Sequence, residues 1–142
     1  MDFYVILKNM VEEIATEVGL GYPECVYKNA LKLMFRNNGF PYEEERVKSV
    51  KLKGEQIGTV RLDLIVDDHS NKKIIIELKA IQKITDKEIN QVQRYQMLTQ
   101  IDEAYIVNFS LREYSVTRVS CKKKLIKIYQ HQIQKFSQRV LL

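Results

Sequence analysis

Residues 61–81, RLDLIVDDHSNKKIIIELKAI, restrict the fold more than any other part of the sequence. The aliphatic and β-branched runs in this segment are typical of strands that are covered on both faces. The same runs carry three charges, on Asp63, Glu77 and Lys79. Charged side chains are almost never fully buried without a partner. The fold must therefore supply something that makes these three charges tolerable.

The segments on either side of these strands predict helices. Apolar residues at three- and four-residue spacings predict an amphipathic helix over residues 3–18, and a second helix follows Pro23 as far as residue 37. The core face of the second helix is expected to include Val26, Ala30, Leu33 and Met34. A third helix is expected over residues 85–99, with Thr85 and Glu88 forming a capping box.

Strands are expected at about 43–52, 57–66, 73–80, 103–109 and 113–120, and a basic amphipathic helix from Cys121. The element order is then αα, βββ, α, ββ, α. This order predicts an α/β (α+β) fold with a central mixed β-sheet flanked by helices. A chain of 142 residues is long enough to bury a core, so we expect a single domain over residues 1–142.

Composition excludes several classes of protein. With 45% hydrophobic and 29% charged residues, the chain is ordinary globular material, and no apolar run approaches the roughly 18 residues of a membrane-spanning helix. Two cysteines and two histidines are too few for a disulfide framework or a Cys/His metal cage. We expect an intracellular, cytoplasmic protein with no membrane contact, or one at a nuclear or viral-replication site if its source is eukaryotic or viral.

Positive charge is concentrated at the C-terminal end. Residues 111–142 hold eight Lys or Arg and one Glu, whereas residues 1–110 hold fifteen basic and seventeen acidic side chains. Such asymmetry fits a polyanionic partner. A solvated, lysine-rich terminal helix explains it equally well.

The charged strands can be explained by a metal ion. In a hairpin closed near residues 69–72, Asp63 lies at or near the level of Glu77. Two adjacent carboxylates repel unless a cation separates them, and a hard divalent ion held also by the Leu78 carbonyl would do so. Lys79 would then stand beside the metal. The alternative is an internal ion pair, in which Lys79 or Arg61 supplies the counter-charge.

Two helices carry further polar pairs that this site would use. Glu24 and Tyr27 lie three residues apart at the start of the second helix, on one helix face. Gln91 and Tyr95 lie four apart on the helix that follows the Glu-Leu-Lys strand. A carboxylate from one helix and an amide with a phenol from the other would converge on the sheet.

Together these motifs make the chain resemble the GxxExxY family, a branch of the PD-(D/E)XK nuclease superfamily with a restriction-endonuclease-like core. Gly21, Glu24 and Tyr27 match its name motif, and QVQRYQ matches a Gln-x-x-x-Tyr motif shared with RecB-like exonucleases. The resemblance covers roughly residues 5–110, so residues 110–142 form a basic extension outside it. The sequence departs from the family at several positions, Leu62 and Glu88 among them, but keeps every expected metal ligand.

The resemblance implies hydrolysis of phosphodiester bonds in nucleic acid, with DNA the expected substrate and Mg²⁺ or Mn²⁺ the cofactor. It implies that Glu24, Asp63, Glu77 and the Leu78 carbonyl hold the metal, that Lys79 positions the attacking water, and that Gln91 and Tyr95 steady Lys79 or a phosphate. The alternative is a catalytically silent nuclease-fold module that binds nucleic acid or a protein. A third option is a structural domain with internal ion pairs.

Basic side chains outside the motifs are the expected contacts to the nucleic-acid backbone. They are Arg61, Lys51, Lys53, Lys83, Lys122, Lys123, Lys124 and Lys127. A nuclease that cuts duplexes with one site per chain often works as a pair of subunits, so a homodimer is one expected assembly.

Overall fold

The computed structural model describes residues 1–122, 131 and 133–135. The helices and strands of residues 1–122 are α1 (Phe3–Val18), α2 (Glu24–Asn37), β1 (Tyr42–Leu52), β2 (Glu55–Asp67), β3 (Lys73–Lys79), α3 (Asp86–Thr99), β4 (Glu103–Phe109) and β5 (Tyr114–Arg118). This order confirms the predicted fold class. Most of the predicted basic helix after Cys121 lies outside the described residues.

The five strands form one mixed sheet in the order β1-β2-β3-β4-β5. Strands β3 and β4 run parallel, and the other three neighbouring pairs run antiparallel. Helix α3 connects the two parallel strands, as a crossover between parallel strands requires. Strand β5, expected at about 113–120, forms the edge of the sheet opposite β1.

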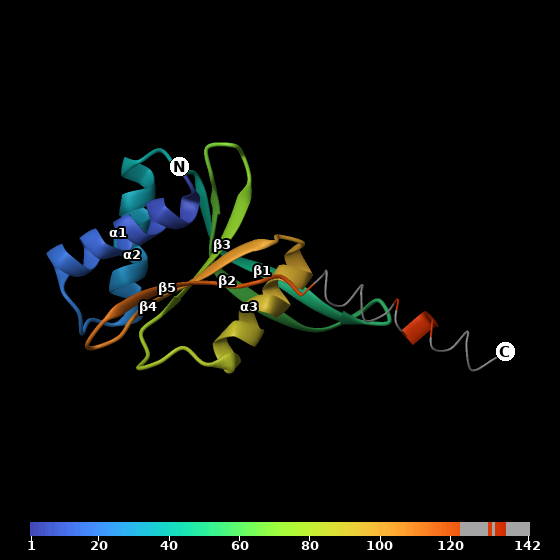
Figure 1. Cartoon of the computed structure of the whole chain (residues 1–142). Helices are drawn as coiled ribbons and strands as arrows, with labels where there is room; N and C mark the ends of the chain where they lie inside the picture. The colour runs from blue at the N-terminus through green and yellow to red at the C-terminus, as the bar shows by residue number, and fades with distance from the viewer. Residues whose placement is uncertain (123–130, 132, 136–142) are drawn as a thin grey trace.

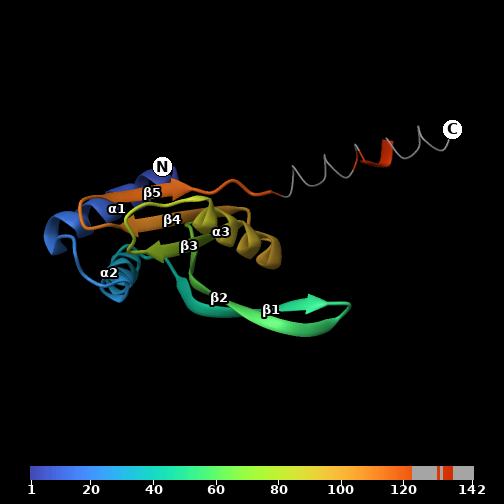
Figure 2. The ribbon, with the colours of Figure 1, turned by 90° about the horizontal axis from the view of Figure 1, so that it is seen from below.

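Helices cover the sheet on both faces (Figures 1 and 2). Helices α1 and α2 pack on one face, where they bury Ile74 and Ile76 of β3, and α3 packs on the other face against Ile75. Strand β3 lies between β2 and β4 and is buried on both faces. This position accounts for the uninterrupted isoleucine run, because each successive side chain enters a different core layer.

The predicted core face of α2 is right only in part, because Ala30 and Met34 pack against the core but are only partly buried. The buried residues are Tyr27, Leu31 and Phe35, and Leu33 is 48% exposed. The aromatic ring of Tyr27 stacks on Phe109 with centroids 4.1 Å apart. Both sets of residues recur every four positions, so spacing does not distinguish them, and the face with two large aromatic rings is the one that the core takes.

Strands β1 and β2 continue past the body of the sheet as a two-stranded arm, which we define as residues 46–61. Strand β2 pairs with β3 only from Leu64 to Asp67, whereas its pairing with β1 continues to Glu55. The arm projects away from α1 and α2 (Figure 2). Its turn, Lys53-Gly54, has φ values of 51° and 81°, which suit a tight two-residue hairpin turn.

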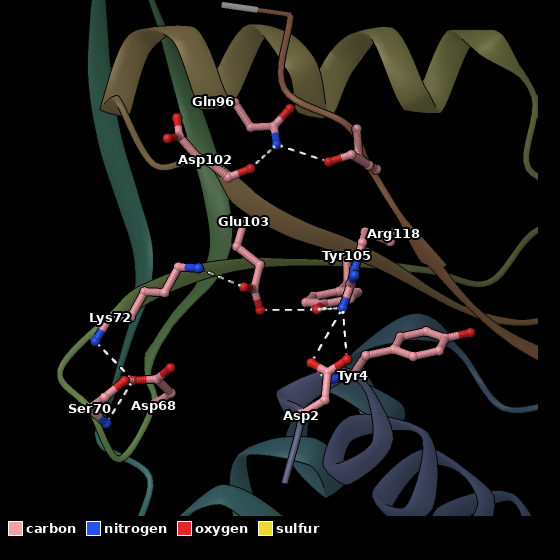
Figure 3. A network of polar contacts seen from close by, with 11 residues as sticks. Asp2, Tyr4, Asp68, Ser70, Lys72, Gln96, Asp102, Glu103, Tyr105 and Arg118 are labelled. Atoms are coloured by element: carbon pink, nitrogen blue, oxygen red, sulfur yellow. Dashed lines mark hydrogen bonds and ion pairs between the residues drawn. The ribbon is translucent and has the colours of Figure 1, made fainter. Parts of the chain in front are cut away.

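A polar network connects the start of α1 to strands β4 and β5 (Figure 3). Arg118 of β5 lies 3.2 Å from the Asp2 carboxylate and donates to the Tyr105 hydroxyl at 3.0 Å. The Tyr105 hydroxyl donates to Glu103, which also pairs with Lys72 at 3.0 Å. These contacts hold the first turn of α1 against the sheet. They lie near the start of β3, whereas Lys79 of the candidate site lies at its end.

Candidate active site

Asp63 lies at the point where β2 leaves β3. The β2–β3 ladder ends at the Leu64–Ile76 pair, and its next step would place Asp63 opposite Glu77. Beyond the last pair, the Leu78 N–H has no strand partner on this side, and the Asp63 Oδ2 accepts its hydrogen bond at 2.9 Å. The carboxylate of Asp63 therefore accepts the hydrogen bond that the backbone of a paired strand would accept, and this bond holds it beside β3.

The backbone is irregular at the same level on β1. Glu45 has φ = 53°, in the left-handed region, and the β1–β2 ladder omits the Glu45–Asp63 pair. On β2, Leu62 enters the α3-side core although Leu64 enters the α1–α2 side. Residues two apart on a regular strand share one face. The strand therefore turns over at Asp63, and this twist separates the arm from the body.

Glu77 is the most buried carboxylate of the site, with 4% of its surface exposed. Its Oε2 finds no hydrogen-bond partner among the described residues, while its Oε1 lies 3.8 Å from the Lys79 Nζ. Burial raises the pKa of Glu77 to about 9, and the negative charge of Asp63 adds to the increase. A buried, unpartnered carboxylate oxygen beside a second carboxylate is a position that a cation would stabilise.

Lys79 is held from two sides on the α3 face of the sheet. Its Nζ donates to the Gln91 Oε1 at 3.0 Å and faces Glu77. Tyr95, one helical turn after Gln91, is 5% exposed. Burial raises the pKa of the Tyr95 hydroxyl to about 12, and the charges of Glu77 and Asp63 contribute to this increase. Tyr95 therefore keeps its proton at neutral pH and can act as a hydrogen-bond donor but not as a base.

Glu24 is the first residue of α2 and is exposed at the edge of the site. Partial burial raises the pKa of Glu24, and the neighbouring charge of Asp63 raises it further, whereas Lys79 lowers it. Glu24 is thus within electrostatic reach of both residues. In the described part of the chain, however, no three Asp, Glu, His or Cys side chains converge closely enough to form a metal cage by themselves.

The donor set fits a hard divalent ion. Asp63 and Glu77 offer carboxylate oxygens, the type of donor that Mg²⁺ and Mn²⁺ prefer. Mg²⁺ commonly uses only one or two carboxylates and keeps several waters, so two side chains with the Leu78 backbone suffice. Arg61 does not supply the counter-charge considered above, because its guanidinium pairs with Glu45 at 3.6 Å.

Gly21 and Tyr27 shape the loop that presents Glu24. Gly21 has φ = 102°, a conformation that side chains rarely adopt. The buried Tyr27 hydroxyl donates to the Gly19 carbonyl at 2.9 Å and accepts from the Tyr22 N–H. Glu24 therefore begins its helix directly after a loop whose backbone is held by the hydroxyl of Tyr27, one helical turn later.

The basic residues expected to contact nucleic acid do not form a single patch. Lys51 and Lys53 lie at the tip of the arm, and Lys83 lies on the β3–α3 loop, at the other end of the molecule in both views (Figures 1 and 2). Lys122 is partly buried. Lys123, Lys124 and Lys127 lie outside the described residues.

Sequence reasoning assigned no role to Asn108, the penultimate residue of β4. Its buried side chain accepts from the Ile81 N–H at 3.0 Å and donates to the Ile81 carbonyl at 2.9 Å. It thereby holds the chain immediately after Lys79. The available signal was a lone amide within an otherwise apolar strand, a position at which buried polar groups require partners.

The sequence matches the PD-(D/E)XK nuclease superfamily over residues 2–119. No curated protein matches it significantly. The crystal structure of SSO0001 is similar, with a TM-score of 0.54 and 16% identity, over 77% of this chain and 56% of that chain. This chain therefore spans little more than half of SSO0001, and the likeness shows the fold alone.

Two further structures are more distant. Hjc, a Holliday junction resolvase from the archaeal hyperthermophile Archaeoglobus fulgidus, has a TM-score of 0.44 and 16% identity, over 67% of this chain and 76% of that chain. SPO1766, a protein of unknown function from Silicibacter pomeroyi, has a TM-score of 0.32 and 13% identity, over 75% of this chain and 80% of that chain.

Proposed function

The chain belongs to the PD-(D/E)XK nuclease superfamily, and from this we propose that it is a Mg²⁺- or Mn²⁺-dependent nuclease that hydrolyses phosphodiester bonds, with DNA as the substrate. We place it in the GxxExxY branch, on Gly21, Glu24 and Tyr27. The observation that carries the proposal is the buried Glu77 carboxylate beside Asp63 and Lys79, one oxygen of which has no hydrogen-bond partner among the described residues.

In this proposal Asp63, Glu77 and the Leu78 carbonyl hold the divalent ion, and Glu24 contributes directly or through water. The bound ion would supply charge stabilisation at the phosphate and a water of lowered pKa. The chain's own part is to fix these oxygens. Asp63 is fixed by the Leu78 N–H, and Glu77 by its burial in the sheet.

Lys79 orients the attacking water or a phosphate oxygen. An ammonium group carries more donors than its contacts to Gln91 and Glu77 use, so donor capacity remains for the substrate. Gln91 keeps the ammonium in place, because its amide oxygen accepts without competing for the proton. Tyr95 lies on the same helix and, with its proton retained, donates to the site or to a phosphate.

The test combines Mn²⁺ titration by calorimetry with cleavage of labelled DNA. Asp63→Asn and Glu77→Gln remove one ligand charge each with little change in shape. The matched control is Asp67→Asn on the same strand as Asp63, because Asp67 pairs with Lys73 at 2.9 Å, away from the site. We expect both site variants to lose at least about 100-fold in cleavage rate, since losing a supporting partner of a ligand already costs 10- to 100-fold. Site variants that cut as fast as the control would contradict the proposal.

A second candidate is a nuclease-fold module that binds nucleic acid or a protein without turnover. One observation favours it: among the described residues, no three Asp, Glu, His or Cys side chains form a group that could hold a metal ion. This candidate predicts that the protein binds DNA but leaves it intact in both Mg²⁺ and Mn²⁺. We propose a homodimer only for a nuclease that cuts both strands of a duplex, since one site per chain would then have to act on two strands.

A further inference from the structure

A cavity of about 660 Å³ opens at one end of the sheet, where three loops meet. These are the α1–α2 loop, the β3–α3 loop and the β4–β5 turn, which lie together in both views (Figures 1 and 2). The volume is within the range of small-molecule sites.

The cavity borders the candidate active site through the chain itself. Tyr22, in its wall, stands two residues before Glu24, and Ala80, in its floor, directly follows Lys79. A strand whose phosphate lay at Lys79 would therefore have its neighbouring nucleotide within reach of the cavity.

Each of the three walls is held by a polar side chain that is itself buried. Tyr27 holds the α1–α2 loop through Gly19 and Tyr22. Asn108 holds the β3–α3 loop through both backbone groups of Ile81. The Ser110 hydroxyl holds the β4–β5 turn, where it donates to the Glu113 carbonyl at 2.8 Å. The cavity is thus built in advance, which lowers the entropic cost of binding.

The lining matches a flat, neutral, polar-edged group. Tyr22 is 51% exposed and Leu111 is 81% exposed, so two loops offer large apolar surfaces to whatever enters. Gln82 and Arg112 add hydrogen-bonding groups. Glu113 also lines the cavity, so its negative charge balances the positive charge of Arg112. Aromatic side chains bind nucleobases by stacking, with little dependence on sequence.

We propose that this cavity binds an unstacked nucleobase of the strand that the active site cuts, with Tyr22 as the stacking residue. A base within a duplex cannot enter such a cavity. The substrate is therefore single-stranded, or locally unpaired, next to the cleaved bond. This inference rests on the proposed nuclease function, because it names the substrate class of that site.

The test uses oligonucleotides that carry 2-aminopurine, whose fluorescence reports the stacking of one base. With chelator present to prevent cleavage, wild-type protein should change the fluorescence of a single strand but not of the matched duplex. Tyr22→Ala should weaken single-strand affinity about tenfold or more, whereas Tyr22→Phe should retain it. Leu33→Ala is the control, since Leu33 is about as exposed on α2 but lies outside the cavity.

A parallel cleavage assay in Mn²⁺ separates the two proposals. If wild-type protein cuts DNA and Tyr22→Ala binds and cuts single strands equally well, the base site is wrong and the nuclease stands. If wild-type protein cuts nothing but its fluorescence response depends on Tyr22, the base site stands and the nuclease fails. An equal response to single strand and duplex overturns the base site.

Discussion

At the scale of single residues, the two carboxylates of the candidate site have opposite surroundings. Asp63 accepts a backbone N–H, which satisfies its charge. Glu77 is almost fully buried beside Asp63 and Lys79, with one oxygen unpartnered in the described part of the protein. The protein without a bound cation is therefore stable with Glu77 protonated, and ionising this residue is what costs stability.

Replacing Glu77 with Gln should stabilise the protein in chelator, increasingly so at higher pH. The folded-state pKa of about 9 lies above the ordinary 4.5 of the unfolded chain. Below 4.5 both states keep the proton. Between these values the unfolded chain ionises first, so wild-type stability falls as pH rises. Urea unfolding at pH 5 and pH 8.5 measures the free energy of unfolding of both proteins. The difference in favour of Glu77→Gln should grow between these pH values by at least about 1 kcal/mol, which is less than the free energy that corresponds to a shift of one pKa unit.

The matched control for this experiment is again Asp67→Asn, whose partner Lys73 keeps it in a surface ion pair. Its difference from wild-type protein should stay constant over the same pH range. Parallel stability curves for wild-type protein and Glu77→Gln would show that Glu77 ionises normally and would remove the main argument for a cation at this position.

At the scale of elements, β2 serves two structures. From Leu64 to Asp67 it belongs to the covered sheet, and before Asp63 it belongs to the exposed arm. The arm carries five basic side chains and one acidic side chain. The basic ones are Arg46, Lys48, Lys51, Lys53 and Arg61, and the acidic one is Glu55. A projecting, positively charged hairpin is suited to following a nucleic-acid backbone.

Neutralising the arm tip should weaken DNA binding in a salt-dependent manner. We expect the double variant Lys51→Gln/Lys53→Gln to reduce the slope of log affinity for single-stranded DNA against log salt by up to about 1.4, because each lost phosphate contact on a single strand removes roughly 0.7. The control with the same charge change is Lys8→Gln/Lys32→Gln, on α1 and α2. Fluorescence anisotropy from 50 to 300 mM salt gives both slopes. Equal slopes for the two variants would exclude the arm tip from the interface.

At the scale of the whole molecule, the strands differ strongly in how well they are buried from solvent. Strand β3 lies in the middle of the sheet with helices on both faces, and residues 74–78 are all buried. In the arm, residues 51–59 are all exposed. No helix in the described part of the chain combines the length and apolar character that crossing a bilayer requires. The same domain thus contains a rigid centre and a weakly supported extension.

Amide hydrogen exchange should reproduce this gradient. Residues 74–78 should exchange only through global unfolding, whereas residues 51–59 should exchange through local opening at least about 100-fold faster, since local and global opening free energies differ by several kcal/mol. Mass spectrometry of peptic fragments measures both segments in one experiment, with residues 104–109 of β4 as the internal reference for the core. Equal protection in the arm and in β3 would show that a partner surface covers the arm in solution.

Much of this organisation could be predicted from the sequence, because buried strands and amphipathic helices leave strong patterns. The capping box of α3 is an example: the Glu88 carboxylate accepts from the Thr85 N–H and hydroxyl at 2.8 Å each, as expected. The level of Asp63 beside Glu77 followed from hairpin register. The core face of α2 did not follow, because the stacking of Tyr27 on Phe109 depends on a strand far away in the sequence.

Other features leave no pattern in a single sequence. The left-handed φ of Glu45 occurs at a residue type with no preference for it, so the twist of β2 and the departure of the arm could not be anticipated. The cavity depends on three loops that meet only in the folded chain. Asn108, one of its fixing residues, bonds to Ile81, which lies 27 residues away in the sequence.

The twist at Asp63 has a mechanical consequence. Strand β2 is one continuous backbone, so a force on the arm reaches the sheet through Asp63, and strain there acts on the hydrogen bond to Leu78. A ligand that bends or straightens the arm would shift a carboxylate of the site without contacting it. Movement of the arm would thus be transmitted along the β2 backbone to the candidate active site.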